Sequence, residues 1–537
     1  MNFVLPGLRA AIAAILDWFF PRRRALREIR EAWGKPGKKD AWLADRYFRL
    51  TNSGDDLSHV DDRTWNDLEF PRIFSVLDTT ITRPGSQCLF RMLRTYATDA
   101  DHSGIVHESL QALRCDRELR ERTQLLLTAL NADSAANVID ALFEPRLEAL
   151  KHPRLTVVWS LVSVGLLAGI AASAIPLMLV IPILAVNVAV ITRTGLRRYR
   201  LTETLRALRR MLAVADRLSH LYSDSPIPQL AALAADRPGR ARARRAFRLV
   251  GALDRMSPLG LDTWLNLLFL AEWLVYLYTI DRVAAVRAEL RTAYDLVGSL
   301  DAAIAMASLL ERTRTWCRPV IGPERVLEIE NGCHPLVAEP VANSMTLRQR
   351  SALISGSNMA GKTTFIKMMA INVIFGRTVG ICLAAKATIP AAAVMACIRS
   401  DQSVESGKSR YFAEAEAILS FLRSGTRSTL VVLDEPFSGT NTTERIAAAK
   451  SVLDVLSEHS LVLATTHDVE LQDLLRDRFD MYHFTENPEL RSFFDYHLRT
   501  GPCTERNALR LLARLGFPPQ VISEADAFIA ERNRSKT

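Results

Sequence analysis

The sequence has no closely spaced pair of cysteines. Its seven cysteines are scattered over 537 residues, and no C-x-x-C pair occurs among them. Structural zinc sites commonly use closely spaced cysteine pairs, and disulfide frameworks are typical of short secreted chains rich in cysteine. The pattern therefore predicts reduced domains that face the cytosol, with no zinc site and no disulfide framework.

One long segment of the chain also lacks charge. The 38 residues from 155 to 192 contain no Asp, Glu, Lys, Arg or His. A helix needs about 20 apolar residues to cross a bilayer, so the run is too long for one crossing and long enough for two short ones. Pro176 and Pro182 lie near its midpoint, where a hairpin would turn. The alternative is a buried hairpin in the core of a soluble protein.

Basic residues flank this run on both sides. They are Arg146, Lys151 and Arg154 before it, and Arg193, Arg197, Arg198 and Arg200 after it. Basic flanks favour the cytoplasmic side of a membrane, and two crossings would leave both ends there. We therefore expect anchoring in the inner, cytoplasmic membrane through residues 155–192, with the remaining domains in the cytoplasm. A wholly cytoplasmic protein is the alternative location.

The N-terminus lacks the order of a secretory signal. Residues 1–24 place Arg22–Arg24 after an apolar stretch, whereas a signal peptide begins with charge and ends in a cleavage site of small residues. An interfacial helix at the membrane surface and a terminal helix docked on the protein both remain open.

Positive charge is in excess over the whole chain. The net charge is +9, which favours nucleic acid or an anionic lipid surface as partner. Residues 237–248 hold six arginines in twelve positions. They would contact phosphates of nucleic acid or lipid headgroups, or they form a solvated loop. The candidate contacts are Arg240, Arg242, Arg244 and Arg245.

A second apolar stretch, residues 261–280, contains Asp262 and Glu272. Carboxylates inside a bilayer are costly, so this stretch predicts a buried or interfacial helix. From Phe70 to about residue 150 the pattern is helical, interrupted by a turn at Pro84 and Gly85. After residue 323 short β-rich runs alternate with helices, which predicts an α/β nucleotide-binding domain.

A phosphate-binding loop opens this α/β region. The sequence GSNMAGKT at 356–363 fits G-x-x-x-x-G-K-[ST], and it lies between an apolar strand and a helix, as a P-loop requires. Backbone N–H groups at such a helix start bind phosphate oxygens, Lys362 adds positive charge, and the Thr363 hydroxyl is placed for Mg²⁺. The predicted ATP-binding residues are Gly356, Ser357, Asn358, Met359, Ala360, Gly361, Lys362, Thr363 and Thr364.

Two later strands end in further candidates. The run TLVVLDEP ends in Asp434 and Glu435, and a buried parallel strand would place Asp434 near the Mg²⁺. Glu435 is then positioned to orient or deprotonate the attacking water. The next strand ends at His467, placed to sense the γ-phosphate, although a lone histidine is usually structural. Lys362, Glu435 and His467 are therefore the predicted catalytic residues of a Mg²⁺-dependent ATPase.

These motifs resemble those of the MutS mismatch-repair ATPases, within the ABC class. The P-loop has the Asn-Met of that family at Asn358 and Met359, with Ala360 in place of a glycine. Residues 405–418, 434–444 and 464–471 resemble the family's signature segment, Walker B region and histidine motif. Residues 68–96, 296–311, 334–337 and 494–518 resemble parts of the MutS core, the entry to its ATPase domain and its C-terminal region.

The resemblance implies a homodimer. In this class each nucleotide lies between the P-loop of one subunit and the signature segment of the other. By that match Ser406, Gly407 and Ser409 would meet the γ-phosphate held by the partner's Lys362. ATP binding would close the dimer and hydrolysis would open it, which would move the attached helical levers.

The chain also departs from the family. Mismatch-detecting MutS proteins carry an N-terminal reading domain with a Phe-x-Glu wedge and then a connector, whereas residues 1–65 contain no such wedge and are few for two domains. The segment 339–347 has no aromatic residue to stack on adenine. The charge-free run lies where MutS has its lever helices and DNA clamp.

Together these features predict an α plus α/β fold. The expected order is an N-terminal basic segment (1–65), a first helical core part (66–150), a transmembrane hairpin (151–200), a helical lever and second core part (201–320), a P-loop ATPase domain (321–490) and a helical dimerisation region (491–537). The leading hypothesis is a membrane-anchored ATPase dimer that moves its levers on DNA or on a protein partner. The alternatives are a soluble sensor of DNA mismatches or structures, and an ATP-switched membrane scaffold that binds no nucleic acid.

Overall fold

The computed structural model of the chain forms two compact units. Unit 1 comprises residues 1–53, 74–92 and 104–312, and unit 2 comprises residues 54–73, 93–103 and 313–537. The structure describes residues 21–39, 44–52, 58–97, 100–131, 138–143, 153–221, 227–357, 360–398, 410–423, 429–485, 494–502, 512 and 516–534. The predicted N-terminal helix before Pro21 lies outside the described residues.

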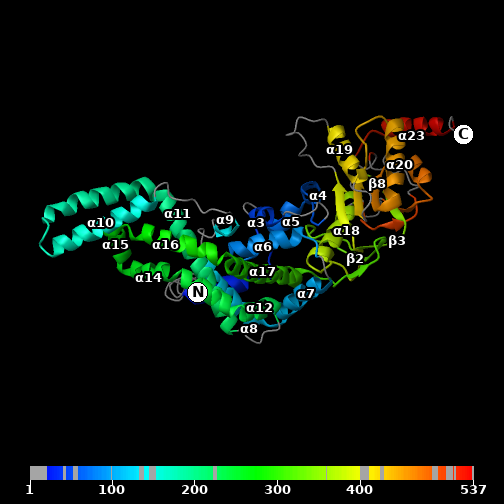
Figure 1. Cartoon of the computed structure of the whole chain (residues 1–537). Coiled ribbons are helices and arrows are strands. Elements are labelled where there is room, and N and C mark those ends of the chain that lie inside the picture. The colour runs from blue at the N-terminus through cyan, green and yellow to red at the C-terminus, as the bar shows by residue number, and fades with distance from the viewer. Residues whose placement is uncertain are drawn as a thin grey trace, which may run out of the picture. The chain divides into compact units, whose positions relative to one another are not determined.

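Unit 1 is helical throughout its described part (Figure 1). Helices α5 (Phe70–Leu77), α6 (Arg83–Arg94) and α7 (Ala100–Cys115) each run from one unit into the other. The other α-helices of unit 1 are α2 (Pro21–Ala32), α3 (Asp45–Thr51), α8 (Arg117–Leu127), α9 (Val138–Phe143), α10 (Pro153–Ala171), α11 (Val180–Leu221), α12 (Pro228–Ala235), α13 (Arg237–Ala246), α14 (Arg248–Met256), α15 (Leu261–Phe269), α16 (Ala271–Ala285) and α17 (Arg287–Arg312). Short 3-10 helices are η1 (Thr128–Leu130), η3 (Leu177–Leu179) and η4 (Ser257–Leu259).

The core of unit 1 is organised around α17. This helix packs against α8, α9, α11, α12, α13 and α16. It is apolar and long enough to cross a membrane, but 83% of its apolar window is buried inside the protein. Its hydrophobic character is therefore explained by packing in the interior of unit 1.

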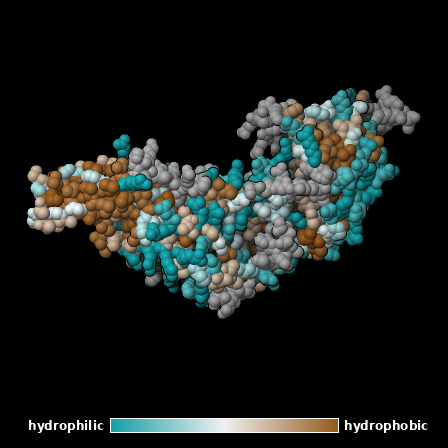
Figure 2. Space-filling view, in the orientation of Figure 1, coloured by the Kyte–Doolittle hydropathy of each residue, from teal (hydrophilic) through white to brown (hydrophobic). Residues whose placement is uncertain are grey.

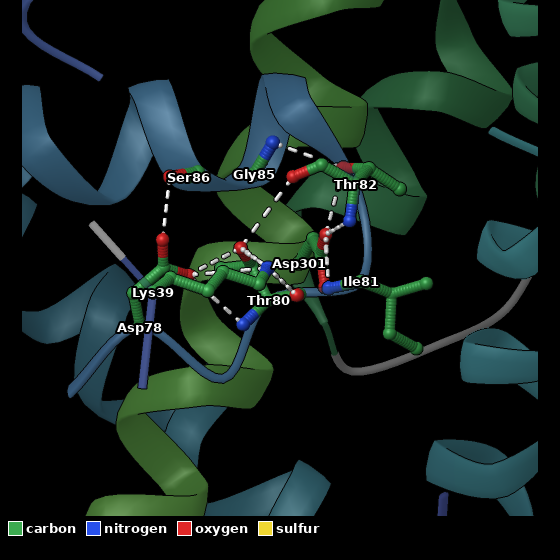
Figure 3. A network of polar contacts seen from close by, with 8 residues as sticks. All are labelled: Lys39, Asp78, Thr80, Ile81, Thr82, Gly85, Ser86 and Asp301. Atoms are coloured by element: carbon green, nitrogen blue, oxygen red, sulfur yellow. Dashed lines mark hydrogen bonds and ion pairs between the residues drawn. The ribbon is translucent and has the colours of Figure 1, made fainter. Parts of the chain in front are cut away.

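A buried polar network ties α17 to the segment between α5 and α6 (Figure 3). The Asp301 carboxylate of α17 accepts hydrogen bonds from the backbone N–H of Ile81 (3.1 Å) and from both the N–H and the hydroxyl of Thr82 (2.7 Å each). Asp78 accepts hydrogen bonds from Thr80 and Ser86 beside it. Because these groups are almost wholly buried, each bond replaces one lost to water.

The same segment corrects the turn predicted at Pro84 and Gly85. Both residues lie in the first turn of α6, and the Thr82 hydroxyl accepts the N–H of Gly85 at 2.9 Å as an N-cap. Proline is tolerated there because the first helical N–H groups have no partner within the helix. A Cβ at Gly85 would come within 2.2 Å of Asp301 Oδ2, so only glycine fits against α17.

The charge-free run forms a helical hairpin of α10 and α11, which lie side by side in Figure 1. The chain reverses between Ala171 and Val180, around Pro176. The Trp159 indole donates a hydrogen bond of 2.7 Å to Asn187 Oδ1 across the pair. Helix α11 extends beyond the apolar run to Leu221, where it joins the packed part of unit 1. Hydrophobic colours cover this hairpin in Figure 2.

Unit 2 contains two sheets. The strands are β1 (Val320–Gly322), β2 (Val326–Gly332), β3 (Asn343–Arg348), β4 (Ser351–Ser355), β5 (Lys386–Pro390), β6 (Ala393–Cys397), β7 (Thr429–Asp434), β8 (Leu461–Thr466), β9 (Phe479–His483) and β10 (Arg499–Thr500). The smaller sheet has the order β1-β5-β2-β3, and the larger has the order β10-β9-β4-β8-β7-β6. In the larger sheet only the β9–β10 pair is antiparallel.

Helices cover the larger sheet. The α-helices that lie wholly in the described part of unit 2 are α4 (Asp62–Asp67), α18 (Lys362–Thr378), α19 (Arg410–Arg423), α20 (Thr442–His459), α21 (Val469–Leu474) and α23 (Pro519–Arg534). Side chains of α19, α20 and α21 form one hydrophobic cluster with Leu353, Val431 and Val462 of the sheet. Every residue of β4, β7 and β8 is buried, as expected for parallel strands covered on both faces.

The exposed edge of the larger sheet is covered by residues from early in the chain. Three backbone N–H groups along β6 and just after it donate hydrogen bonds of 2.9–3.0 Å to these residues. The N–H of Val394 donates to the Tyr96 hydroxyl, that of Ala396 to Thr64 Oγ1, and that of Ile398 to Asp67 Oδ2. Alternate N–H groups of an edge strand are free to pair in this way. Segments 54–73 and 93–103, from the predicted N-terminal segment (1–65) and the predicted first core part (66–150), therefore fold with the α/β unit.

The described C-terminal residues differ from the all-helical prediction for 491–537. Strand β10 pairs with β9 and extends the sheet, and α23 follows. The mixture of a helical unit with an α/β unit confirms the predicted fold class. Residues 503–511 and 513–515, which carry part of the predicted helix–turn–helix, lie outside the described residues.

Candidate nucleotide-binding site

The predicted P-loop follows β4 and leads into α18. Two glycines allow its path, because Gly356 has φ of +134° and Gly361 has φ of +104°, which side chains with a Cβ rarely adopt. A Cβ at Gly356 would also come within 2.4 Å of the carbonyl oxygen of Phe484. Of the predicted loop, Asn358 and Met359 lie outside the described residues, Ala360 precedes α18, and Thr363 and Thr364 lie in its first turn.

Lys362 folds back over the loop. Its ammonium group donates to the carbonyl oxygens of Gly356 (2.8 Å) and Ser357 (2.9 Å), and only 4% of the residue is exposed. The Ser357 hydroxyl is buried and has no hydrogen-bond partner among the described residues. A buried hydroxyl and a buried cation beside helix-start N–H groups form the kind of site that phosphate oxygens complete.

Asp434 meets the P-loop helix from β7. The Thr363 hydroxyl donates a hydrogen bond of 2.9 Å to Asp434 Oδ2. The Thr465 hydroxyl of β8 donates to the other carboxylate oxygen at 2.6 Å and accepts the Glu435 N–H at 2.9 Å. Strand β8 lies between β4 and β7, so Thr465 bridges the gap and fixes the direction of the carboxylate.

Glu435 and His467 complete the cluster at the ends of β7 and β8. Glu435 has φ of +50°, a strained conformation of the kind that collects at functional sites. Its carboxylate contacts His467 Nε2 and lies 3.8 Å from the ammonium of Lys362. His467 Nε2 lies 3.4 Å from the same ammonium. The structure thus brings the three predicted catalytic side chains together.

A pocket of about 450 Å³ opens beside this cluster. Its polar wall includes Ser357, Lys362, Thr363 and Glu435. Its other lining residues are Gly332, His334, Val337, Glu339, Pro340, Val341, Asn343, Gly361, Thr364, Phe365, Met368, Phe484 and Tyr496. Phosphate-binding groups therefore face a cavity whose remaining wall is largely apolar.

Sequence reasoning missed two residues of the apolar wall. Tyr496 was placed only in a C-terminal region, but its backbone carbonyl accepts the Asn343 side-chain N–H at 2.9 Å, which holds it beside the P-loop. Phe484 follows β9 and packs edge-on against Phe365, with ring centres 5.7 Å apart. The sequence could not predict that these two residues lie at the pocket, because the antiparallel pairing of β9 and β10 brings them there.

His334 is a further residue of this pocket. It is 8% exposed, and its Nδ1 accepts the N–H of Leu336 at 3.2 Å. Its Nε2 is buried without a hydrogen-bond partner among the described residues. Burial lowers the pKa of His334 to about 4, despite the opposing effect of Glu69. The ring is therefore neutral at pH 7, with an Nε2–H donor at the pocket wall.

The arginine-rich segment was predicted to contact phosphates or lipid headgroups, or to form a solvated loop, and the structure corrects the loop and one of the four candidate contacts. It forms helix α13, and Arg240 is fully buried, with Nε 3.0 Å from Asp216 Oδ1 and Nη1 bonded to the carbonyl of Leu233. Arg240 is thus a structural residue of unit 1. Arg242 and Arg244 are exposed but pair with Glu289 (3.3 Å) and Asp216 (3.0 Å), and Arg245 is exposed.

The predicted signature residues Ser406, Gly407 and Ser409 lie outside the described residues. Helix α19 begins directly after them at Arg410. Glu414 of this helix accepts the backbone N–H of Phe437 at 2.6 Å, so the segment that follows the signature is attached to the loop after Asp434 and Glu435.

Comparisons with known proteins agree with this geometry. Residues 352–532 match the family model described as MutS domain V. The DNA mismatch repair protein MutS of Thermus aquaticus is 29% identical over 261 residues, which cover 48% of this chain and 32% of that protein. MutS of Chloroflexus aurantiacus is 30% identical over 258 residues (45% and 27%), and DNA mismatch repair protein MutS 2 of Halobacterium salinarum is 27% identical over 275 residues (47% and 31%).

The chain thus spans about a third or less of the length of these curated relatives. The matching family model covers the P-loop, Glu435 and Tyr496, which line the pocket, and Asp434 and His467, which contact Thr363 and Glu435. The members of that family are ATPases. Residues 352–532 are therefore similar to domain V of the MutS family.

Proposed function

We propose that this chain hydrolyses ATP to ADP and phosphate at the pocket beside Lys362. The observation that carries the proposal is the bond between Thr363 of the P-loop helix and Asp434 of β7. This pair occupies the position at which P-loop ATPases hold Mg²⁺. Thr363 Oγ1 and Asp434 Oδ2 would hold the ion, which would neutralise charge on the phosphates.

The residues of the site divide the work of hydrolysis. Lys362 and the N–H groups at the start of α18 bind the phosphates and stabilise negative charge. Glu435 accepts a proton from the attacking water or orients it, since it is the carboxylate nearest to both Lys362 and His467. His467 holds the Glu435 carboxylate in place and lies where it can sense the γ-phosphate.

Base binding falls to the apolar wall of the pocket. The segment before the P-loop supplies no aromatic ring, but Tyr496 and Phe484 line the same cavity. We propose that Tyr496 stacks on the adenine and that the neutral His334 donates its Nε2–H to the nucleotide. The Tyr496 ring lies beside the P-loop, since a Cβ at Gly361 would come within 3.3 Å of it.

The active form is proposed to be a homodimer. MutS-type domains of the ABC class bind each nucleotide between two subunits, and Ser406, Gly407 and Ser409 match the segment that completes the partner's site. The attachment of Glu414 to the loop at Phe437 gives a path by which contact at this segment would reach Glu435. ATP binding would then close the dimer, and hydrolysis would release it.

We further propose that α10 and α11 anchor the protein in the inner membrane. Windows of 18 and 19 residues at Arg154–Ala171 and Leu177–Gly195 have mean hydropathies of 1.8 and 2.0, and only 11% of each is buried within the protein. A core hairpin would be buried, so these helices need an apolar partner of another kind. Basic flanks at both ends favour a cytoplasmic location for both units.

The partner moved by the ATPase is proposed to be DNA or a protein beside the membrane. The relatives described above are named DNA mismatch repair proteins, and the chain is basic, which favours DNA. A soluble DNA sensor is disfavoured by the exposed apolar surface of α10 and α11. A scaffold that binds only lipid through α13 is disfavoured because Arg240, Arg242 and Arg244 pair with carboxylates.

The test is ATPase activity of the full chain in nanodiscs, with and without duplex, mismatched and branched DNA. We expect Mg²⁺-dependent turnover, stimulated by at least one of these DNAs. Turnover without stimulation by any DNA would point to a protein partner, and absence of turnover would refute the ATPase. Fractionation tests the anchor, since recovery in the soluble fraction without detergent would contradict it.

A further inference from the structure

Helix α15 ends abruptly beside the apolar hairpin. Leu270 adopts φ of +53°, and the following helix α16 is bent by 87° from α15. The last carbonyl groups of any helix lack partners within that helix. Here they are not left to water, because the hairpin supplies donors to three of them.

Two polar residues of the hairpin provide these donors. The Asn187 amide donates to the carbonyl oxygens of Leu267 and Leu268 at 2.9 Å each, and the Ser160 hydroxyl donates to that of Phe269 at 2.6 Å. Both Asn187 and Ser160 are fully buried. Since the Trp159 indole satisfies the remaining oxygen of Asn187, the network is closed.

The depth of these contacts follows from the sequence. Ser160 comes six residues after Arg154, and Asn187 comes six residues before Arg193. At 1.5 Å per residue, both lie about 9 Å along the helix axis from the flanking arginine, inside the apolar spans. If the hairpin crosses a bilayer, the C-terminal end of α15 lies below the headgroups, where water cannot satisfy a carbonyl group.

The outer face of α15 and of the η4 turn before it is apolar and exposed. Leu259 is 75% exposed, Leu261 46% and Trp264 62%. The one charged residue of α15, Asp262, lies in its first turn, where the helix dipole favours an acid. Figure 2 shows hydrophobic colours over this end of unit 1 and hydrophilic colours farther along α11.

Charged residues mark the limit of this apolar region. Arg206 of α11 bonds Asp254 of α14 at 3.0 Å and lies 3.8 Å from Glu272 at the start of α16. Helices α14 and α16 thus each contribute a carboxylate to this cluster, whereas Asp262 of α15 forms no ion pair with the described residues.

We propose that α15 is a third membrane element, a short re-entrant helix that enters one leaflet beside the hairpin and is held there by Asn187 and Ser160. Its partner is the acyl region of a lipid bilayer. The inference rests on the proposed membrane anchor. It adds that unit 1 is joined to the membrane through α15 as well as through the hairpin.

Quenching of tryptophan by brominated lipids tests this in nanodiscs of the full chain. The Trp264 signal is obtained as the difference between wild type and Trp264→Phe, and Trp159 in the hairpin reports whether the anchor itself inserts. Trp33 follows α2 in unit 1, and the Arg120 guanidinium lies 3.7 Å from the centre of its ring. The difference between wild type and Trp33→Phe gives the Trp33 signal, which is the control for a tryptophan outside the membrane. We expect lipid quenching of Trp264 and of Trp159, and none of Trp33.

The outcomes separate the two proposals. Quenching of Trp159 without quenching of Trp264 would overturn the re-entrant helix and leave the anchor standing. Lipid quenching of neither residue would overturn both. Asn187→Leu, compared with Val186→Leu, provides a second measurement: it should increase amide exchange in residues 261–270 while Trp159 remains quenched, and unchanged exchange would contradict the role assigned to Asn187.

Discussion

The Thr363 hydroxyl and the Asp434 carboxylate lie 2.9 Å apart, although 71 residues separate them in the chain. One begins the P-loop helix and the other ends β7, and Thr465 of the intervening strand supports the carboxylate from the opposite side. This relationship turns three separate strand ends into one site. The predictions about catalysis depend on it.

Asp434→Asn should raise the Mg²⁺ concentration needed for half-maximal ATP turnover. An amide carries no charge, so it holds a divalent cation less strongly than a carboxylate. The measurement is a Mg²⁺ titration of turnover at saturating ATP. Asp473→Asn, an exposed site with a weak ion pair to Arg476, is the matched control. An unchanged Mg²⁺ requirement in Asp434→Asn would remove Asp434 from the metal site.

Glu435→Gln should bind ATP normally and lose turnover. The substitution keeps the shape of the side chain but removes the base, and loss of a general base typically costs about 10²- to 10⁴-fold in rate. Binding is measured by ATP titration and turnover by phosphate release. Glu458→Gln, on the outer surface of α20, should leave both unchanged. Persistent hydrolysis in Glu435→Gln would assign the base elsewhere.

Two inactive variants should complement each other if the site is shared between subunits. Lys362→Ala removes the phosphate contact of one subunit, and Ser409→Ala removes the signature contact that it offers to its partner. In a mixed dimer one site carries both defects and the other carries neither. An equal mixture should therefore recover about a quarter of wild-type turnover. No recovery after subunit exchange would indicate that each site lies within one chain.

His334 should make unit 2 less stable as the pH falls. Its pKa is lowered from 6.5 to about 4 by burial, so the unfolded chain binds a proton at a pH where the folded ring stays neutral. The stabilisation is present above pH 6.5 and is lost as the pH falls to about 4, by about 3 kcal/mol.

Hydrogen exchange in β2 and β3 at pH 7 and pH 4.5 measures this loss within unit 2. The pH-dependent part should be smaller in His334→Gln than in wild type, because glutamine does not titrate. Exposed His459→Gln provides the control for loss of an ordinary histidine. Equal pH dependence in His334→Gln and wild type would show that His334 is not the group responsible.

Gly85→Ala should destabilise unit 1 by about 1–3 kcal/mol, the usual cost of overpacking a buried contact. The added methyl would lie 2.2 Å from Asp301 Oδ2, inside the network that holds α6 to α17. Gly195→Ala in α11 is the control, because nothing lies within 4 Å of its Cβ position. Denaturant unfolding of the two variants makes the comparison. Equal free energies of unfolding for Gly85→Ala and Gly195→Ala would mean that α17 shifts to accommodate the methyl group without loss of stability.

The parts of the candidate nucleotide site could be predicted because each part is local in the chain. A P-loop is one strand, one turn and one helix start, and Asp434 and His467 each follow a continuous apolar run that reads as a buried parallel strand. The same holds for the hairpin, because a run of 38 residues without charge is visible in the sequence alone. Pro84 and Gly85 misled the prediction because both a turn and a first helical turn accept them, and the N-cap at Thr82 decided between the two.

The sequence by itself determined which residues could bind phosphate, hold Mg²⁺ and enter an apolar phase, because those properties belong to residue type and local spacing. Tertiary structure decided which distant groups meet. It buried Arg240 against Asp216, placed Tyr96, Thr64 and Asp67 along the edge of β6, and brought Tyr496 to the nucleotide pocket. It also set Asn187 against the end of α15. These contacts join segments tens to hundreds of residues apart, and they depend on hydrogen-bond partners that no local pattern specifies.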